Sequence, residues 1–312
     1  MAGCWLAGFC FTSTASCRQI QDSRLCSKFT VEPFGDVSPA VRDYPGMNIN
    51  FKLVKFNHFS ACADICHGIF SRFGGCIRKP FDSLNIALSV GDEEKKVLKN
   101  RQIIIDALGG GLPVFINQVH GKKIFVLKNG KSGLPKDSIG FSCNGLKSDF
   151  IMPAGPEADG IVTDIPGVLL FIQVADCQPV MLYDPVKKVV ANIHSGWKGS
   201  LKNIVGEGVD TMQREFGSDP ASVLAGVGPS LGPCCSEFIN YRSEIPEKFM
   251  GYRRGKNHFD FWQMTVDQLT AKGIKKENIE LCRICTRCSH DSFFSYRHEK
   301  ITGRFASVIK KL

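Results

Sequence analysis

The chain has 312 residues, of which 43% are hydrophobic and 22% are charged, and its net charge is +9 at pH 7. This composition is typical of a soluble globular protein, and no apolar run approaches the roughly 18 to 20 residues that span a membrane. The basic residues are scattered and lack the interleaved aromatic residues of a nucleic-acid module, so we expect neither a membrane nor a nucleic acid as partner.

The first 45 residues differ from the rest of the chain. Residues 1–30 contain three basic residues but only one acidic residue, Asp22, together with seven serines and threonines. This composition is typical of a segment that directs a protein to a chloroplast or mitochondrion. The alternative is a disordered tail, and we would then expect a cytoplasmic protein. We place the boundary of this segment at about residue 45.

Downstream of this segment, strand and helix patterns alternate. Residues 67–76 form a short apolar run that ends in a Gly-Gly turn, residues 93–109 have the spacing of an amphipathic helix, and residues 113–121 resemble a strand that ends at His120. Residues 128–156 are rich in Gly, Ser, Lys and Pro, and we predict a loop insertion there.

The central part of the chain predicts a hairpin and a helix. The apolar run 168–174 suits a strand that is covered on both faces. Residues 179–183 and 189–193 predict two antiparallel strands, and the apolar spacing from 201 to 216 predicts a helix. The whole pattern indicates an α+β (mixed α/β) fold with one catalytic domain over residues 50–312.

The predicted hairpin places Cys177 and His194 at neighbouring strand ends, and three interpretations are open. They could be a buried thiol and a satisfied imidazole, or a cysteine nucleophile with its histidine base, or two metal ligands with His120 as the third. Two imidazoles and one thiolate suit a catalytic zinc ion, whose fourth position stays open. The same donors also suit copper, which is the second choice.

The segment CRICTRC (282–288) has the spacing of a metal or iron–sulfur site. A closed site needs four ligands at matching positions, and no second cysteine-rich segment is evident as its partner. We therefore predict that Cys282 and Cys285 are alternating core positions of a strand. The chain contains 14 cysteines, but it is long enough to build an apolar core, which indicates free thiols in a reducing compartment.

Eight motifs in a fixed order resemble a known family. They are FSRFGG (70–75), SLNIALSVGD (83–92), NQVHG (117–121), ADGIVTD (158–164), ADCQPV (175–180), IHSGWKG (193–199), GVGPSLGPCC (226–235), and FFSYR with TGRFAS (293–307). Together they resemble the laccase-domain, or multicopper polyphenol oxidase-like, family over about residues 65–312. The resemblance implies a layered sandwich of sheets with the site at strand ends.

The resemblance also implies chemistry. In that family the corresponding residues bind zinc, which implies a zinc ion on His120, Cys177 and His194, and members are described as purine nucleoside phosphorylases with adenosine deaminase and methylthioadenosine phosphorylase activities. The older multicopper name does not fit, because the chain has seven histidines and no His-x-His pair. Two departures from the family pattern, Lys198 and His298, stand where arginine is usual.

Five further residues are candidates outside the metal ligands. Arg72 and Arg297 could bind phosphate through their guanidinium groups, or form structural ion pairs. Asp176 could be a general acid/base or a loop-capping group. Trp197 could stack on a purine base or pack in the core, and the turn at Ser230 could present backbone N–H groups to an anion.

We therefore expect a zinc-dependent purine nucleoside phosphorylase that cleaves adenosine, inosine or methylthioadenosine with phosphate, with adenosine deamination as a side activity of the same ion. The net charge and the two arginine candidates favour phosphate as co-substrate. The alternatives are a copper-dependent phenol oxidase, a cysteine hydrolase and a non-enzymatic metal-binding protein. The sequence does not predict an oligomeric state.

Overall fold

The computed structural model describes residues 39–44, 47–128 and 155–312, with side chains from residue 52 onward. Residues 1–38 of the predicted targeting segment and most of the predicted loop insertion lie outside this description. The last residues of the predicted targeting segment, Pro39–Tyr44, form strand β1. This strand pairs with β2 (Met47–Val54), so the sheet includes residues upstream of the domain start that we predicted at residue 50.

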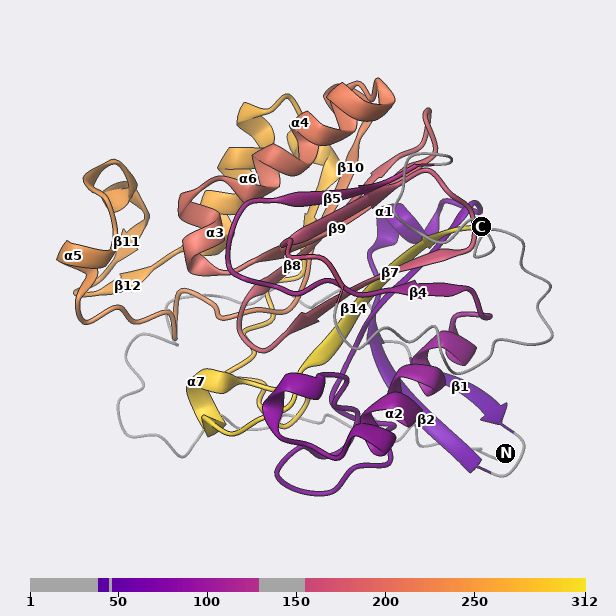
Figure 1. Ribbon diagram of the computed structural model, residues 1–312. Helices are drawn as coiled ribbons and strands as arrows, with labels where there is room; N and C mark the ends of the chain where they lie inside the picture. The colour runs from indigo at the N-terminus through magenta and orange to yellow at the C-terminus, as the bar shows by residue number, and fades with distance from the viewer. Residues whose placement is uncertain (1–38, 45–46, 129–154) are drawn as a thin grey trace, which may run out of the picture. The chain divides into compact units, whose positions relative to one another are not determined.

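The described residues form two six-stranded mixed sheets (Figure 1) and one two-stranded sheet. The first sheet has the spatial order β1 (Pro39–Tyr44), β2 (Met47–Val54), β3 (Ile65–Phe70), β14 (Phe305–Lys311), β7 (Val168–Val174) and β4 (Leu112–Val114). The second has the order β13 (Ile279–Leu281), β10 (Leu224–Val227), β8 (Gln178–Asp184), β9 (Val189–Ser195), β6 (Gly160–Thr163) and β5 (Ile124–Leu127). The two-stranded sheet pairs β11 (Arg253–Arg254) with β12 (His258–Phe259).

The two large sheets pack face to face, and helices cover their outer faces. Helix α2 (Glu94–Ala107) packs on the first sheet, whereas α4 (Ile204–Phe216) and α6 (Phe261–Ala271) pack on the second, as Figure 1 shows. The short helices are α1 (Asn57–Ser60), α3 (Trp197–Leu201), α5 (Tyr241–Glu244) and α7 (Tyr296–Glu299). The predicted α+β sandwich is therefore confirmed.

Strand β7 shows how the apolar sequence fills this sandwich. Leu169 and Phe171 contact the cluster beneath α2, while Leu170 and Ile172 belong to the core between the sheets. Successive side chains of a strand point to opposite faces, so a strand buried on both faces must be apolar throughout. The prediction of a doubly covered strand at 168–174 is confirmed.

A buried amide links the two sheets at their centre. Asn192 on β9 donates hydrogen bonds through Nδ2 to the carbonyl oxygens of Leu170 (2.9 Å) and Ser307 (2.8 Å) on the opposite sheet. Its Oδ1 accepts a bond from the Ser307 hydroxyl at 3.0 Å. A buried amide must find such partners, and these bonds fix β9, which carries His194, against the first sheet.

Three local predictions differ from the structure. The helix predicted for 201–216 is two helices, because Asn203 adopts a left-handed backbone (φ 58°) and accepts a hydrogen bond from Gly206 N as the cap of α4. The strand predicted for 113–121 ends at Val114. Cys282 and Cys285 do not alternate in a strand: β13 ends at Leu281, and the two cysteines pack in different apolar clusters.

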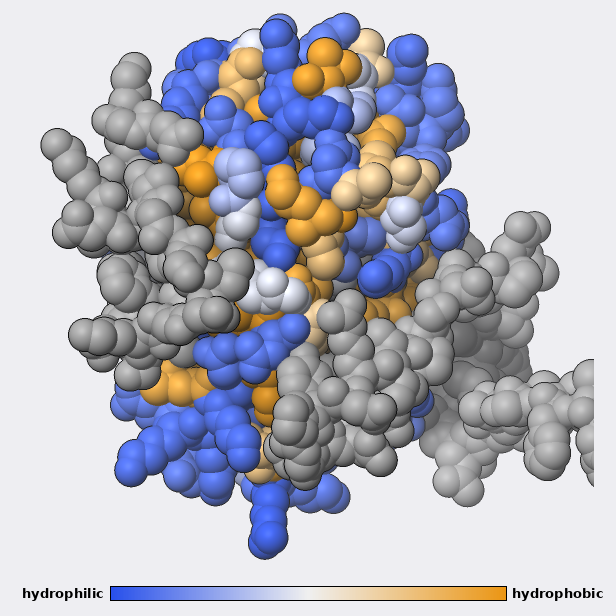
Figure 2. Space-filling model, turned by 90° about the vertical axis from the view of Figure 1, so that its right-hand side faces the viewer, coloured by the Kyte–Doolittle hydropathy of each residue, from blue (hydrophilic) through white to orange (hydrophobic). Residues whose placement is uncertain are grey.

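Among the described residues, no helix is both long and apolar enough to cross a membrane. Figure 2 shows one face of the molecule, on which hydrophilic residues predominate and apolar residues are scattered among them.

Candidate metal and substrate site

The three predicted ligands meet where strand β8 begins and strand β9 ends. The two strands are antiparallel, and Pro179 pairs with His194, so Cys177 lies just before β8 and beside the end of β9. His120 arrives from the segment after β4, and its Nε2 lies 3.8 Å from the sulfur of Cys177. The ligand atoms of all three side chains lie within 4.8 Å of one another. The predicted hairpin that joins Cys177 to His194 is confirmed.

A buried carboxylate that the sequence analysis missed orients two of these residues. Asp159, directly before β6, is fully buried, and its Oδ1 lies 2.8 Å from Nδ1 of His194. The same carboxylate accepts backbone hydrogen bonds from His120 (2.9 Å) and Gly121 (2.6 Å). A carboxylate on Nδ1 leaves Nε2 of a histidine for a metal. The only signal in the sequence was an acidic residue inside the motif ADGIVTD.

The charges of the site favour a thiolate. Burial alone would raise the pKa of Cys177, but the charge of His194 and hydrogen bonds to both histidines overcome it and lower that pKa to about 6. Burial would lower the pKa of His194, but the Cys177 charge and the bond to Asp159 raise it to about 9. Thiolate is the form of cysteine that binds a metal. A metal ion that binds next to this thiolate can replace the proton of the neighbouring His194 imidazolium. The donor set therefore fits a metal ion.

Gly196 makes the close approach possible. A Cβ atom at this position would lie 2.6 Å from Cδ2 of His120 and 3.1 Å from the sulfur of Cys177. Any larger residue would push these side chains apart, which explains the first glycine of the Gly-Trp-Lys-Gly turn.

The three side chains line a cavity of about 1000 Å³. Aromatic residues form part of its wall, among them Trp197 and Phe238, whose rings pack edge to face with centroids 5.6 Å apart. Ligand pockets of this kind combine apolar walls with a few polar groups. Trp197 is half-buried: it packs on Phe238 and also forms part of the cavity wall.

Arg72 does not line this cavity. Its guanidinium donates to the carbonyl oxygens of Asp82 (2.9 Å) and His290 (2.8 Å) and forms an ion pair with Glu299 at 3.0 Å. It also lies over the ring of Phe294. These contacts correspond to the structural ion pair, one of the two roles that we considered for Arg72 from the sequence. Arg72 is therefore not available to bind phosphate in this cavity.

Arg101 lines the cavity instead, and the sequence analysis did not single it out. It is 1% exposed, lies over the Phe115 ring at 3.9 Å, and donates through Nε to Ile86 O at 2.9 Å. Its buried Nη1 has no hydrogen-bond partner among the described residues. An unpaired buried donor is costly, so this atom has capacity for a further hydrogen-bond acceptor. The signal was an arginine on the buried face of the predicted helix 93–109.

Two other arginines line the same cavity. Arg297, predicted from the sequence, donates through Nη1 to Glu237 O at 2.7 Å and lies over the Phe238 ring. Arg304 donates through Nη1 to the carbonyl oxygens of Thr302 and Gly303, and burial lowers its pKa. Arg101, Arg297 and Arg304 therefore contribute positive charge to the lining of the cavity.

Asp176 also lines the cavity, but its carboxylate is occupied. Oδ1 accepts hydrogen bonds from the hydroxyls of Thr286 (2.6 Å) and Ser295 (2.7 Å), and Oδ2 accepts one from Arg297 N at 2.6 Å. Three donors on one carboxylate favour the loop-capping role over the acid/base role, and the positive φ of 85° is consistent with a turn.

Ser230 lies outside the cavity lining. Its backbone N–H donates to Ile284 O at 3.1 Å, and its hydroxyl accepts a bond from Trp262 Nε1 at 2.7 Å. The predicted anion contact is therefore replaced by contacts that join two loops.

Known proteins resemble this chain in sequence. A family model described as multi-copper polyphenol oxidoreductase laccase matches residues 66–311. A purine nucleoside phosphorylase of Bacteroides thetaiotaomicron is 30% identical over 271 residues, covering 83% of this chain and 96% of that protein. Purine nucleoside phosphorylase YfiH of Escherichia coli is 31% identical over 252 residues, covering 77% and 90%.

A solved structure shares the fold. The crystal structure of Bacillus licheniformis hypothetical protein YfiH aligns with a TM-score of 0.70 at 29% identity, covering 85% of this chain and 96% of that one. The resemblance seen in the sequence motifs is confirmed. Relatives named purine nucleoside phosphorylase are similar to this chain over most of their own length, and the chain belongs to the multi-copper polyphenol oxidoreductase laccase family.

Proposed function

We propose that this protein is a zinc-dependent purine nucleoside phosphorylase that uses phosphate to release the base from adenosine, inosine or methylthioadenosine. One observation carries the proposal: the candidate ligands His120, Cys177 and His194 line the same cavity as Arg101, whose buried Nη1 has no hydrogen-bond partner among the described residues. The first is suited to a cation and the second to an anion. The relatives' names supply the class of substrate.

The metal site would hold zinc through two imidazoles and a thiolate, the donor types that zinc prefers. When bound, zinc supplies a Lewis acid with an open fourth position. Asp159 holds His194 in the tautomer that presents Nε2, and it also fixes the backbone at His120. These bonds keep two ligands in place before any metal arrives.

Arg101 and Arg304 would bind phosphate in place of Arg72. A guanidinium matches two phosphate oxygens at once, and the ring of Phe115 holds the Arg101 side chain in position. In phosphorolysis a phosphate oxygen attacks C1′ of the sugar as the bond to the base breaks and the base takes up a proton. The products are the free base and the sugar 1-phosphate, which is ribose 1-phosphate for adenosine and inosine and methylthioribose 1-phosphate for methylthioadenosine. Fixing the phosphate near the nucleoside removes much of the entropic cost of that encounter.

Trp197 and Phe238 would hold the purine, because both rings line the cavity and aromatic faces stack on bases. Adenosine deamination at the same open position remains our prediction for a side activity. The contacts of Asp176 support a positioning role in the loop, so we do not assign proton transfer to it.

The test compares two buried arginines. In Arg101→Gln we expect the KM for phosphate to rise about 10- to 100-fold, since a charged hydrogen bond contributes about 1.5 to 3 kcal/mol, with zinc content unchanged. Arg72→Gln is the matched control: it should lower thermal stability but leave the phosphate KM unchanged. An unchanged phosphate KM in Arg101→Gln would contradict the assigned phosphate contact. Phenol oxidation that increases with added copper would favour the copper-dependent phenol oxidase. If the metal-free protein is active and alkylation of its thiols abolishes that activity, a cysteine hydrolase would be favoured.

A further inference from the structure

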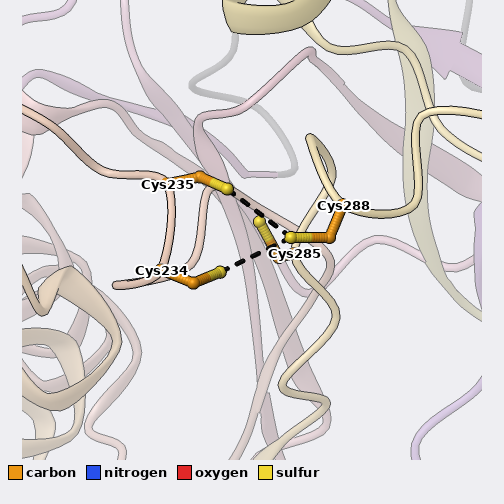
Figure 3. Close-up of side chains that lie close together, drawn as sticks. All are labelled: Cys234, Cys235, Cys285 and Cys288. Carbon is orange, nitrogen blue, oxygen red and sulfur yellow. Dashed lines mark hydrogen bonds between the residues drawn. The ribbon is translucent and has the colours of Figure 1, made fainter. Parts of the chain in front are cut away.

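A second group of potential ligands lies outside the substrate cavity. Cys234 and Cys235 on one loop face Cys285 and Cys288 on another, and Figure 3 shows the four sulfurs pointing toward one another. All four sulfur atoms lie within 4.8 Å of one another. We call these residues the four-cysteine cluster. The expectation that CRICTRC has no cysteine-rich partner is wrong, because the adjacent pair Cys234-Cys235 is that partner.

The sulfur distances suit one ion and not a disulfide. Cys288 Sγ lies 3.6 Å from Cys234 Sγ and 3.5 Å from Cys235 Sγ, whereas a disulfide needs about 2.0 Å. Metal–sulfur bonds of about 2.3 Å in a tetrahedron place the sulfurs about 3.8 Å apart. An iron–sulfur cluster interposes several irons and sulfides, so its cysteines must lie farther apart than those around one ion.

The backbone holds the two loops in this arrangement. In the first loop, the N–H groups of Cys235 and Ser236 both donate to Gly232 O at 2.9 Å. In the second, Ser289 N donates to Cys285 O at 2.9 Å, which closes one helical turn and brings Cys288 to the same side. Between the loops, Gly232 N donates to Cys285 Sγ at 3.3 Å. Backbone N–H groups that donate to a sulfur stabilise its thiolate.

The loops also approach too closely for a side chain at Gly232. A Cβ atom there would lie 3.1 Å from Cys285 Cβ and 2.8 Å from the Trp262 ring. Trp262 packs with Cys235 and Cys285 in one small apolar cluster. The inner side of the four-cysteine cluster is therefore buried and apolar, whereas Cys288 is exposed to solvent.

We propose that the four-cysteine cluster binds one zinc ion in a closed tetrathiolate site, separate from the open site in the cavity. Four thiolates complete the tetrahedron and leave no position for a substrate, which is the arrangement of a structural zinc site. Each thiol gives up its proton when the ion binds, and no oxidation is involved. The ion cross-links two loops that lie 50 residues apart in the sequence.

These loops support the wall of the substrate cavity. Leu231 and Arg297 line the cavity and flank the cluster along the chain. Leu231 N donates to Asp176 O at 2.8 Å, and Thr286 donates to the Asp176 carboxylate. Asp176 directly precedes Cys177, so the loops that carry the four-cysteine cluster are bonded to the residue before a ligand of the open site. The closed site therefore has a positioning role.

The experiment measures metal content in the full chain, purified under reducing conditions without chelators. We expect two zinc ions per chain in the wild type, and one in Cys288→Ser, which removes an exposed ligand without opening a core cavity. Cys234→Ser should give the same loss. Cys282→Ala is the matched control, because Cys282 belongs to the same CRICTRC segment but lies outside the cluster, and it should keep both ions.

Cobalt(II) replacement supplies a second readout. The wild type should show the intense visible bands of four-thiolate coordination. Cys288→Ser should lose these bands and keep only the weaker absorption of the open site, while His120→Ala should keep them. Equal zinc content in the wild type, Cys288→Ser and Cys234→Ser would overturn the proposal. A loss of two free thiols in protein purified without reductant would indicate a disulfide and would also overturn it. The same holds if the purified protein contains iron and acid-labile sulfide. The wild type could also bind a single zinc ion that Cys288→Ser loses. This result would show that the open site holds no zinc, so the proposed function would fail while the four-cysteine site would be supported.

Discussion

The open site and the four-cysteine cluster bring potential metal ligands together in different ways. In the open site, three ligands line a cavity, and the bonds of Asp159 hold two of them. In the cluster, four thiols meet between two loops against the side chain of Trp262. The two groups therefore differ in residue type, in the number of donors and in access to a cavity, and the roles that we propose for them, one in chemistry and one in structure, rest on these differences.

Two buried arginines make a similar contrast. Arg72 has partners on each side of its guanidinium, among them Glu299. Arg101 keeps a buried Nη1 without a partner among the described residues, and it lines the cavity. An arginine whose donors are all used stabilises the fold, whereas one with an unused donor has capacity for a ligand.

The largest effect should come from removing a ligand of the open site. We expect Cys177→Ala to lose that metal ion and to lower kcat/KM by about 1000-fold, because the Lewis acid contributes several kcal/mol. Cys282→Ala, a cysteine outside both sites, should retain activity. Steady-state assays of nucleoside cleavage beside metal analysis test this. Full activity in Cys177→Ala without a metal ion in the open site would contradict the catalytic role that separates this site from the four-cysteine cluster.

A smaller effect should follow from changing the carboxylate that orients the open site. In Asp159→Asn we expect zinc affinity there to fall about 10- to 100-fold, since a support of this kind contributes that much. The ion of the four-cysteine cluster should be retained, because Asp159 is not part of it. Competition with a coloured chelator would resolve the two affinities. Equal weakening of both ions would show that the variant damages the fold as a whole.

Protons should compete with metal at the open site. Between about pH 6 and 9, Cys177 is already a thiolate but His194 still carries a proton, so zinc binding must release that proton and the affinity should rise tenfold per pH unit from this group. Below about pH 6 the thiol is protonated too, and the dependence should steepen. Zinc titrations of metal-free protein across this range give the slope. A flat affinity from pH 6 to 9 would contradict the ion pair.

The smallest effect on chemistry is expected from the N-terminus, which we predict to be a targeting segment. Deletion of residues 1–38 should leave both metal ions and the activity unchanged while it moves a fluorescent fusion from an organelle to the cytoplasm. Unchanged localisation would contradict the targeting role. Loss of activity would show that these residues belong to the catalytic unit.

The sequence predicted the features that depend on local pattern. The apolar alternation around Cys177 and His194 indicated a hairpin, and the hairpin brought the two ligands together. The apolar run at 168–174 likewise indicated a strand between two layers, because both of its faces had to be covered.

Features that depend on contacts between distant segments were missed. Nothing in the sequence near Asp159 says that its carboxylate meets His194, 35 residues away. The pairing of Cys234 with Cys288 requires a loop approach that only the fold creates. Arg72 stood in a motif and Arg101 did not, yet the fold decides which guanidinium reaches the cavity.

The most direct test of the proposed function is product analysis on metal-free protein reloaded with zinc, with inosine or adenosine as substrate. We predict free base and ribose 1-phosphate only when both zinc and phosphate are present, with the yield following occupancy of the site formed by His120, Cys177 and His194. Base release that is equal without phosphate, or that continues in protein without zinc at this site, would contradict the account.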